Sequence, residues 1–172
     1  MEPTYRIRRA QPGELAALPE IERLAAERFA SFGLAEVFSR IVTPIELLHE
    51  RSPAGQVWVA ASDDDGRVGF AVVSTLDGNA HLDELDVHPD HGRRGIGAAL
   101  VETACAWAQS SGYHAITLST LRNVPWNAPF YVKCGFRILA EWELTAAIRQ
   151  LLESEARFGL PMKDRVLMRR DF

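Results

Sequence analysis

Residues 85–100 read Leu85-Asp86-Val87-His88-Pro89-Asp90-His91-Gly92-Arg93-Arg94-Gly95-Ile96-Gly97-Ala98-Ala99-Leu100: a strand end, a turn rich in glycine and arginine, and the start of a helix. The first N–H groups of a helix lack intrahelical acceptors, and the helix dipole places positive charge beside them. Gly95 and Gly97 leave no Cβ in the path of an anion, and Arg93 and Arg94 add formal charge. We expect a phosphate or pyrophosphate site here, with an ordinary glycine-rich turn as the alternative.

Two common phosphate-binding motifs do not fit this stretch. A nucleotide-hydrolysing loop needs Gly-Lys followed by Ser or Thr, which the sequence lacks here. A dinucleotide site needs a third glycine three positions after Gly97, where Leu100 stands instead. The sequence therefore disfavours both nucleotide hydrolysis and nicotinamide binding.

The segments before this stretch predict a helical region followed by a meander of strands. Periodicity and turn residues predict strands at 4–9, 56–62, 67–75 and 80–87, and helical regions that begin at Pro12 and Pro44. Pro19 is expected to bend or split the first helical region. Thr43 and Glu46 have the spacing of a capping box for the second helix.

The segments after residue 95 predict an alternation of helices and strands. We expect helices at 95–110, 129–134 and 145–158, the last capped by Thr145, and strands at 115–120, 136–143 and 165–170. A strand, a helix and a further strand in succession predict a right-handed crossover in a mixed α/β sheet.

Composition places the chain among ordinary folded proteins. It has 172 residues, 47% hydrophobic and 24% charged, which predicts a single domain over residues 1–172. The two cysteines, Cys105 and Cys134, are too few for a disulfide framework or a four-thiolate zinc site. The sequence has no apolar run of membrane-spanning length, and its N-terminus is charged where a signal peptide is apolar. We expect a cytoplasmic protein with no membrane association.

The charge is divided unevenly along the chain. Residues 1–90 hold 8 Lys and Arg against 16 Asp and Glu, whereas residues 91–172 hold 11 against 7. A basic second half suits an anionic ligand and an acidic first half suits a cationic one, although chance and solvated faces explain the same numbers. The net charge of −4 and the absence of a long basic run argue against nucleic-acid binding.

Two segments together resemble a known enzyme family. Residues 85–100 resemble motif A of the GCN5-related N-acetyltransferases, usually Gln/Arg-x-x-Gly-x-Gly/Ala after a strand. About 30 residues later, Asn127-Ala128-Pro129-Phe130-Tyr131-Val132-Lys133-Cys134-Gly135-Phe136 resembles motif B of the same family. In motif A, Gly92 stands where Gln or Arg is usual, so the side-chain contact made there is in doubt and Arg93 or Arg94 is its replacement.

The resemblance implies an α/β fold with a mixed, mostly antiparallel twisted sheet of about six to seven strands. Helices flank this sheet, and a central βαβ unit binds acetyl-CoA, the acyl donor; no metal is implied. By position in the motifs, the pyrophosphate would be held by the amides of Arg93, Arg94, Gly95, Ile96, Gly97 and Ala98. The backbone groups of Leu85 and Val87 would pair with the pantetheine arm, and Asn127 would contact the pantetheine or its adjoining backbone.

Acetyl transfer to an amine needs a base for the ammonium and an acid for the departing thiolate. Tyr131 matches the family's usual acid, with a core tyrosine as the alternative, and a positioned acid or base contributes ~10²–10⁴-fold. Glu84 is the leading base, acting through a water, with Asp83 and Asp86 as rivals. Much of the family uses water chains without a dedicated carboxylate.

The remaining candidates are weaker. His88 and His91 have metal-ligand spacing, but they flank Pro89 in a turn without a third ligand nearby, so we predict no metal. The helix at 145–158 has three open roles: capping the acceptor site, contacting a second copy in a homodimer, or packing on the core.

The sequence thus predicts an N-acetyltransferase in which the amine attacks acetyl-CoA directly in a ternary complex. We expect the acceptor to be a small-molecule amine. The alternatives are a protein-amine acetyltransferase and a non-catalytic acyl-CoA-binding or regulatory domain.

Overall fold

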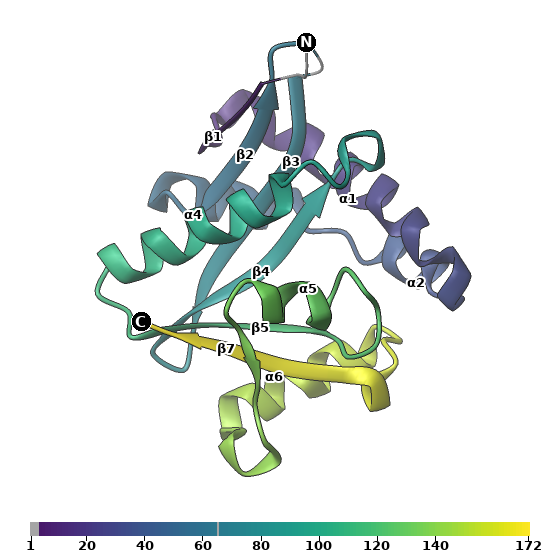
Figure 1. Cartoon of the computed structure of the whole chain (residues 1–172), viewed down its shortest axis with the longest axis vertical. Helices are drawn as coiled ribbons and strands as arrows, with labels where there is room; N and C mark the ends of the chain where they lie inside the picture. Colours follow the sequence, from purple (N-terminus) through teal and green to yellow (C-terminus); the bar gives the residue numbers. More distant parts are fainter. Residues whose placement is uncertain (1–3, 65) are drawn as a thin grey trace. The chain divides into compact units, whose positions relative to one another are not determined.

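The computed structural model describes residues 4–64 and 66–172 (Figure 1). The chain divides into two compact units. The first comprises Met1–Val73 with Glu84–Ala104, and the second comprises Ser74–Asp83 with Cys105–Phe172. The single domain expected over residues 1–172 stays a prediction.

The strands form the mixed sheet that the family resemblance implied. They are β1 (Tyr5–Arg9), β2 (Val57–Ser62), β3 (Gly66–Leu76), β4 (Asn79–Val87), β5 (Ala115–Leu121), β6 (Arg137–Ile138) and β7 (Arg165–Asp171). Among the described residues these strands make one seven-stranded sheet in the order β1-β2-β3-β4-β5-β7-β6. The pairs β1–β2, β2–β3, β5–β7 and β6–β7 are antiparallel, and β4–β5 is parallel. The predicted fold class, including the crossover from β4 to β5 through a helix, is confirmed.

Most helices of the first unit precede β2, and one short helix follows β4. They are η1 (Pro12–Ala17), α1 (Leu18–Ala26), η2 (Glu27–Phe32), α2 (Ala35–Arg40), α3 (Ile45–Arg51), η3 (Ser52–Ala54) and η4 (Pro89–His91), where η marks a 3-10 helix. Pro19 lies in the first turn of α1 and divides the expected helical region into η1 and α1, as predicted.

The capping box expected at Thr43 is wrong. The residue before α3 is Pro44, and no side chain caps the helix. The Thr43 amide instead donates a hydrogen bond to Glu22 Oε2 at 2.8 Å. A buried carboxylate therefore takes the place of the local cap.

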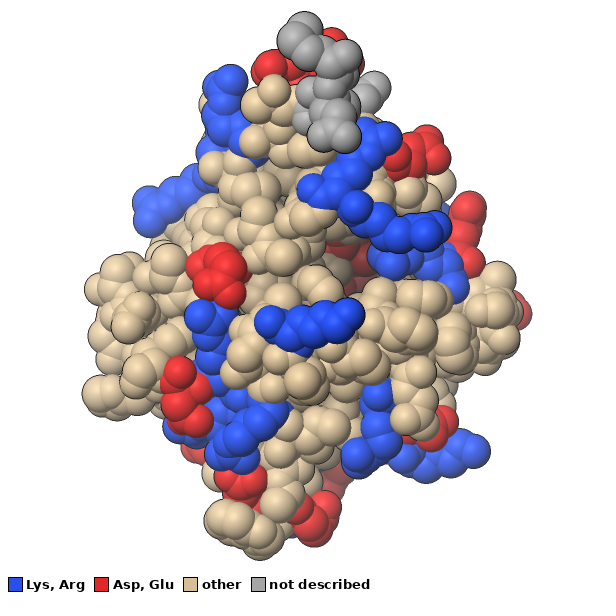
Figure 2. Space-filling view, in the orientation of Figure 1, with Lys and Arg blue, Asp and Glu red and all other residues tan. Residues whose placement is uncertain are grey.

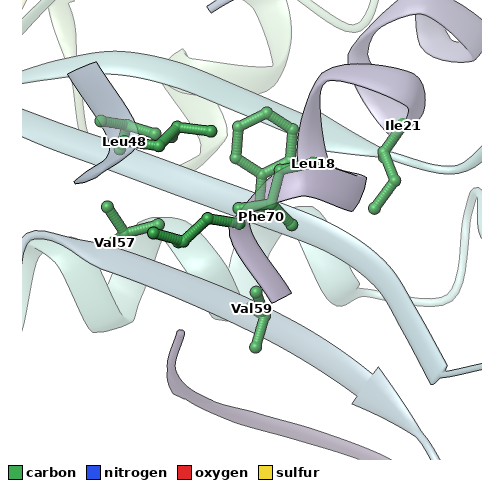
Figure 3. Close-up of a cluster of buried hydrophobic side chains, with 8 residues drawn as sticks. Leu18, Ile21, Leu48, Val57, Val59 and Phe70 are labelled. Atoms are coloured by element: carbon green, nitrogen blue, oxygen red, sulfur yellow. The ribbon is translucent and has the colours of Figure 1, made fainter. Parts of the chain in front are cut away.

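The core of the first unit fixes α1 against the strands. Leu18 and Ile21 of α1 and Leu48 of α3 pack with Phe70 of β3, and all four side chains are at most 5% exposed (Figure 3). Burying such side chains stabilises the fold by about 1.5–3 kcal/mol each. Because Glu22 follows Ile21 on the buried side of α1, this packing also carries a carboxyl group into the interior.

β3 and β4 come unusually close at Gly69. A Cβ on Gly69 would lie 2.9 Å from the Asp86 carbonyl oxygen, 3.3 Å from Val87 Cγ2 and 3.4 Å from Leu100 Cδ1. Leu100 belongs to α4 (Ile96–Ser110), and Gly69 and Phe70 face opposite sides of the sheet by strand alternation. Within the first unit, α4 thus covers the face opposite α1, and the glycine allows the strand that carries the acidic residues to pack closely.

The second unit is built on the antiparallel pair β5–β7. This pair runs from Ala115 beside Asp171 to Leu121 beside Arg165. The parallel pair β4–β5 is recorded where both strands begin, at Ala80 beside Ile116 and at His81 beside Thr117. The helices are α5 (Ala128–Lys133), η5 (Glu141–Glu143), α6 (Ala146–Arg157) and η6 (Met162–Asp164).

The ends of β6 and α6 show how local hydrogen bonds set element boundaries. Thr145 caps α6 as predicted, because its side chain accepts a hydrogen bond from the Ile148 amide at 3.3 Å. The strand expected over 136–143 is too long, since β6 covers only Arg137–Ile138. Glu143 turns the chain into η5 by accepting from the Ala140 amide at 2.8 Å and pairing with Arg137 at 2.8 Å.

Charged side chains of opposite sign adjoin one another over the face shown in Figure 2. Ion pairs in the second unit include Arg149 with Glu141 at 2.7 Å and Arg169 with Asp171 at 2.6 Å. Exposed pairs of this kind contribute about 0–1 kcal/mol each, so they account for charge in the sequence without implying a ligand. Among residues 4–64 and 66–172, the structure contains no helix with the length and apolar character required to span a bilayer.

Candidate active site

The predicted anion-binding segment forms one turn between β4 and α4. The His91 amide donates to the His88 carbonyl at 2.9 Å and the Gly92 amide to the Pro89 carbonyl at 3.1 Å. Arg93 then adopts a left-handed backbone with φ 60°, and Gly95 follows with φ 79°. Gly92 has φ −64°, so the residue in the strained conformation is the arginine and not the glycine before it.

The start of α4 supplies the backbone donors that an anion requires. The first helical hydrogen bond runs from the Ala99 amide to the Gly95 carbonyl at 3.0 Å. The amides of Ile96, Gly97 and Ala98 therefore emerge from the helix without intrahelical acceptors. Successive amides around left-handed residues form anion-binding concavities. The predicted Arg93–Ala98 segment is brought together as a loop with the local geometry of such a site.

The two arginines of the turn have different surroundings. Arg94 Nη1 donates to the Tyr5 hydroxyl at 2.6 Å, which ties it to β1. Arg93 is exposed; burial lowers the pKa of the Arg28 guanidinium, and the nearby charge of Arg93 lowers it further. Tyr5 lies 89 residues from Arg94 and carries no sequence signal that could have linked it to this turn.

The left-handed arginine predicts a stability change. Replacing Arg93 with glycine is expected to stabilise the folded state by about 0.5–1 kcal/mol, because glycine adopts φ 60° without a Cβ clash while its greater unfolded-state entropy offsets part of the gain. Urea unfolding measures the change. Arg93→Ala is the matched control: it removes the guanidinium but keeps the Cβ, so no comparable gain is expected. Equal gains in the two variants would contradict backbone strain as the cause.

Three carboxyl groups gather beside this turn in the first unit. Glu84 and Asp86 lie two residues apart on β4 and so share a face of the strand. Glu22 of α1 joins them, and a carboxylate oxygen from each residue lies within 4.8 Å of the others. Glu84 Oε1 also accepts a hydrogen bond from the Leu85 amide at 3.1 Å.

The environment of this carboxyl cluster (Glu22, Glu84 and Asp86) favours protonated forms. Burial, followed by the charge of Glu84, raises the pKa of Glu22 to about 9. Burial and the charges of Glu84 and Glu22 raise the pKa of Asp86 well above its usual range, with Arg28 of η2 acting in the opposite direction. Glu22 therefore holds a proton at neutral pH, and the pKa of Asp86 is shifted in the same direction. Such a cluster has the groups to accept and return a proton near that pH.

Of the three predicted base candidates, the structure separates one from the other two. The Asp83 carboxylate accepts a hydrogen bond from Ser74 Oγ at 2.8 Å, whereas Glu84 and Asp86 lie together in the cluster. Sequence reasoning missed Glu22. The sequence feature that could have identified Glu22 is its helical spacing from Leu18 and Ala25, which puts a charged residue on the buried face of α1.

The predicted His88 and His91 lie in the same turn, and each ring has a hydrogen-bond partner. His88 Nδ1 accepts from the Asp90 amide at 3.2 Å, and His91 Nδ1 lies 3.2 Å from the Tyr5 hydroxyl. The two rings pack edge to face, with centroids 5.7 Å apart. That no metal is bound stays a prediction.

The backbone of β4 is oriented as the pantetheine prediction requires. The His88 amide donates to the Val68 carbonyl of β3 at 2.8 Å. Backbone N–H and C=O groups of consecutive residues point to opposite edges of a strand, so those of Val87 and Leu85 point away from β3. Because the Leu85 amide donates to Glu84 Oε1, the groups that face an extended ligand are the Leu85 carbonyl and the peptide groups of Val87.

In the second unit, the predicted Asn127 immediately precedes α5, and the predicted Tyr131 lies within it. Asn127 Nδ2 donates to the Thr120 hydroxyl at 2.7 Å, while its buried Oδ1 accepts no hydrogen bond from any residue that the structure describes. An unpartnered buried acceptor is rare and suits a ligand that brings an N–H group. Tyr131 is 8% exposed, and its ring packs against those of Phe130 and Phe136 at centroid distances of 5.0 and 5.8 Å.

Known proteins share this sequence pattern and fold. The profile of the Acetyltransferase (GNAT) family matches residues 18–136, more than half of the chain. The peptidyl-lysine N-acetyltransferase YjaB of Salmonella typhimurium is 31% identical over 99 residues, which cover 58% of this chain and 62% of that protein. The chain thus aligns with about three fifths of the length of this curated relative.

Two solved structures extend the similarity over nearly the whole chain. The PaiA N-acetyltransferase of Thermoplasma acidophilum, solved with coenzyme A, has a TM-score of 0.71 at 20% identity and covers 98% of this chain and 99% of its own. Apo YjaB of Escherichia coli has a TM-score of 0.59 at 25% identity, covering 96% and 95%. The family match, supported by the shared fold and both motifs, shows that the chain belongs to the acetyltransferase (GNAT) family.

Proposed function

We propose that this chain is an N-acetyltransferase that transfers an acetyl group from acetyl-CoA to a primary amine by direct attack in a ternary complex. The observation that carries the proposal is the turn at Arg93–Ala98, where two left-handed residues and a helix N-terminus present several amides to an anion. The names of the related proteins, N-acetyltransferases solved in part with coenzyme A, support this choice of donor.

The chain's own groups fit the chemistry of acetyl-CoA along its length. The amides of Arg93, Arg94, Gly95, Ile96, Gly97 and Ala98 would hold the pyrophosphate. Leu85 and Val87 would pair with the pantetheine through their backbone, and Asn127 Oδ1 would accept a hydrogen bond from a pantetheine amide. Acetyl-CoA supplies an electrophilic thioester carbonyl and a thiolate leaving group.

The reaction makes one C–N bond and breaks one C–S bond. The ammonium of the acceptor first loses a proton, through water, to Glu84 of the carboxyl cluster. The neutral amine attacks the thioester carbon, and the departing sulfur takes a proton from the Tyr131 hydroxyl. The proton that the attacking nitrogen then sheds restores the Tyr131 hydroxyl, and the proton held by Glu84 passes to solvent. The products are the N-acetyl amine and coenzyme A, with one proton released. Glu22, which is protonated at neutral pH, would donate a hydrogen bond that holds the Glu84 carboxylate, with Asp86 beside them in the cluster.

The acceptor is proposed at the level of an alkylammonium group. The carboxyl cluster suits a cation, and a small primary amine and a lysine side chain both carry an alkylammonium cation. The sequence favoured a small-molecule acceptor. The relative that aligns with part of this chain is named a peptidyl-lysine acetyltransferase, which favours a lysine side chain as the acceptor. A non-catalytic acyl-CoA-binding domain remains the contrasting hypothesis.

Calorimetric titration with acetyl-CoA, alongside NADH and ATP, tests the donor. Selective binding of acetyl-CoA is expected, and binding of a control instead would overturn the proposal. Thiol release is then measured with two acceptor panels, unstructured lysine-containing peptides and small primary amines. Turnover with one panel identifies the acceptor class. Donor binding without thiol release on either panel would favour the non-catalytic domain.

A further inference from the structure

Tyr5 connects the first strand to the turn that we assign to the donor. Its hydroxyl accepts a hydrogen bond from Arg94 Nη1 at 2.6 Å and lies 3.2 Å from His91 Nδ1. The rings of Tyr5 and His91 meet edge to face, with centroids 5.9 Å apart and planes at 89°. One side chain of β1 thus contacts the turn on both sides of Arg93.

The direction of these hydrogen bonds follows from the groups themselves. A guanidinium only donates, so the Tyr5 oxygen is the acceptor from Arg94. The hydroxyl hydrogen is then left to donate to His91 Nδ1. His91 is 7% exposed and Arg94 is exposed, so one hydroxyl joins the buried end of the turn to its exposed end.

β1 is a firm anchor for this contact. Tyr5 pairs with Ser62 in the β1–β2 ladder. Three residues further on, Arg8 makes two hydrogen bonds of 2.7 Å to the two carboxylate oxygens of Glu14, whose side chain is 8% exposed. A two-point pair of this kind restricts the strand in position and in rotation.

The segment between the two contacts is the strained part of the turn. Arg93 holds φ 60°, a conformation that persists in a residue with a Cβ only where the surroundings fix it. His91 precedes Arg93 and Arg94 follows it, and both meet the Tyr5 hydroxyl. Freeing that hydroxyl would let the turn relax and disperse its amides.

We propose that Tyr5 is a positioning residue for the donor: its hydroxyl fixes the turn from His91 to Arg94, so that the amides of residues 93–98 face the pyrophosphate. This inference rests on the proposed function, in which acetyl-CoA binds at that turn. Tyr5 acts through the loop and does not itself touch the reacting atoms.

Tyr5→Phe tests the inference because it keeps the ring and removes only the hydroxyl. The Kd and the KM for acetyl-CoA are expected to rise about fivefold, the size of effect typical for the loss of one ordinary hydrogen bond, while kcat stays within about twofold. Tyr113→Phe is the matched control. The Tyr113 hydroxyl makes a comparable hydrogen bond of 2.8 Å to Thr75 Oγ1, so its loss is expected to leave Kd, KM and kcat unchanged.

A double-mutant cycle with Arg94→Ala separates positioning from a general loss of stability. If Tyr5 acts through Arg94, the double variant weakens acetyl-CoA binding by less than the product of the single effects. An unchanged Kd in Tyr5→Phe, equal weakening in Tyr113→Phe, or fully multiplicative effects would overturn the inference. Failure of the unmodified protein to bind acetyl-CoA would instead refute the proposed function.

Discussion

Replacing Tyr131 with phenylalanine is expected to lower kcat about a hundredfold, while the Kd for acetyl-CoA stays unchanged. The hydroxyl is the proposed proton donor to the departing thiolate, and phenylalanine keeps the ring but cannot donate. Steady-state kinetics with a responsive amine measure kcat, and calorimetry with acetyl-CoA measures Kd. The expected result is a loss confined to the chemical step.

Packing makes this substitution a specific test. The Tyr131 ring contacts Phe130 and Phe136, and both contacts are available to a phenylalanine ring. The free energy of unfolding is therefore expected to change by less than about 1 kcal/mol. An unchanged kcat would mean that Tyr131 is a core tyrosine and that the thiolate leaves without this acid. A large loss of stability would assign the residue to packing.

Glu22→Gln is expected to stabilise the folded protein by about 2–3 kcal/mol at pH 7. In the folded state burial raises the pKa of Glu22 from 4.5 to about 9. Between these values the folded chain holds a proton that the unfolded chain has released, so this group makes stability fall as pH rises from 4.5 towards 9. Glutamine resembles the protonated acid and does not titrate, which removes the effect.

Urea unfolding at pH 5, 7 and 8 measures the difference between the two proteins. The gain from Glu22→Gln is expected to be small at pH 5 and to grow with pH. The groups that face Glu22 are the Thr43 amide and the other members of the carboxyl cluster, Glu84 and Asp86, with Arg28 near Asp86. The substitution removes the Glu22 charge, one of the causes that raise the pKa of Asp86, and leaves the other groups in place.

The matched control for this effect lies on the same helix. Glu20 pairs with Arg23 and its side chain is 57% exposed, so Glu20→Gln is expected to change stability by no more than about 0.5 kcal/mol at any of the three pH values. Destabilisation by Glu22→Gln at every pH would show that Glu22 is ionised in the folded protein and held by a cationic partner.

Local sequence patterns determined most of the elements and the assignment to a family. The strand, glycine-rich turn and helix at residues 85–110 depend on neighbours a few positions apart, and periodicity and turn chemistry report such neighbours directly. The motif at 127–136 is local in the same way. The strand expected over 136–143 ended early because another local interaction was stronger: Glu143 capped a turn, and β6 ends at Ile138. The capping box at Thr43 instead gave way to a distant residue, Glu22.

The tertiary structure alone decided which side chains meet around those elements. Glu22 lies 62 residues from Glu84, and Tyr5 lies 89 residues from Arg94, yet each pair belongs to one cluster. No periodicity records such meetings, because they depend on how α1 and β1 pack against β4 and the turn after it. The raised pKa of Glu22 has the same origin: a carboxyl group gains or loses its proton according to the burial and charges that surround it in the folded chain, and these surroundings come from distant parts of the sequence.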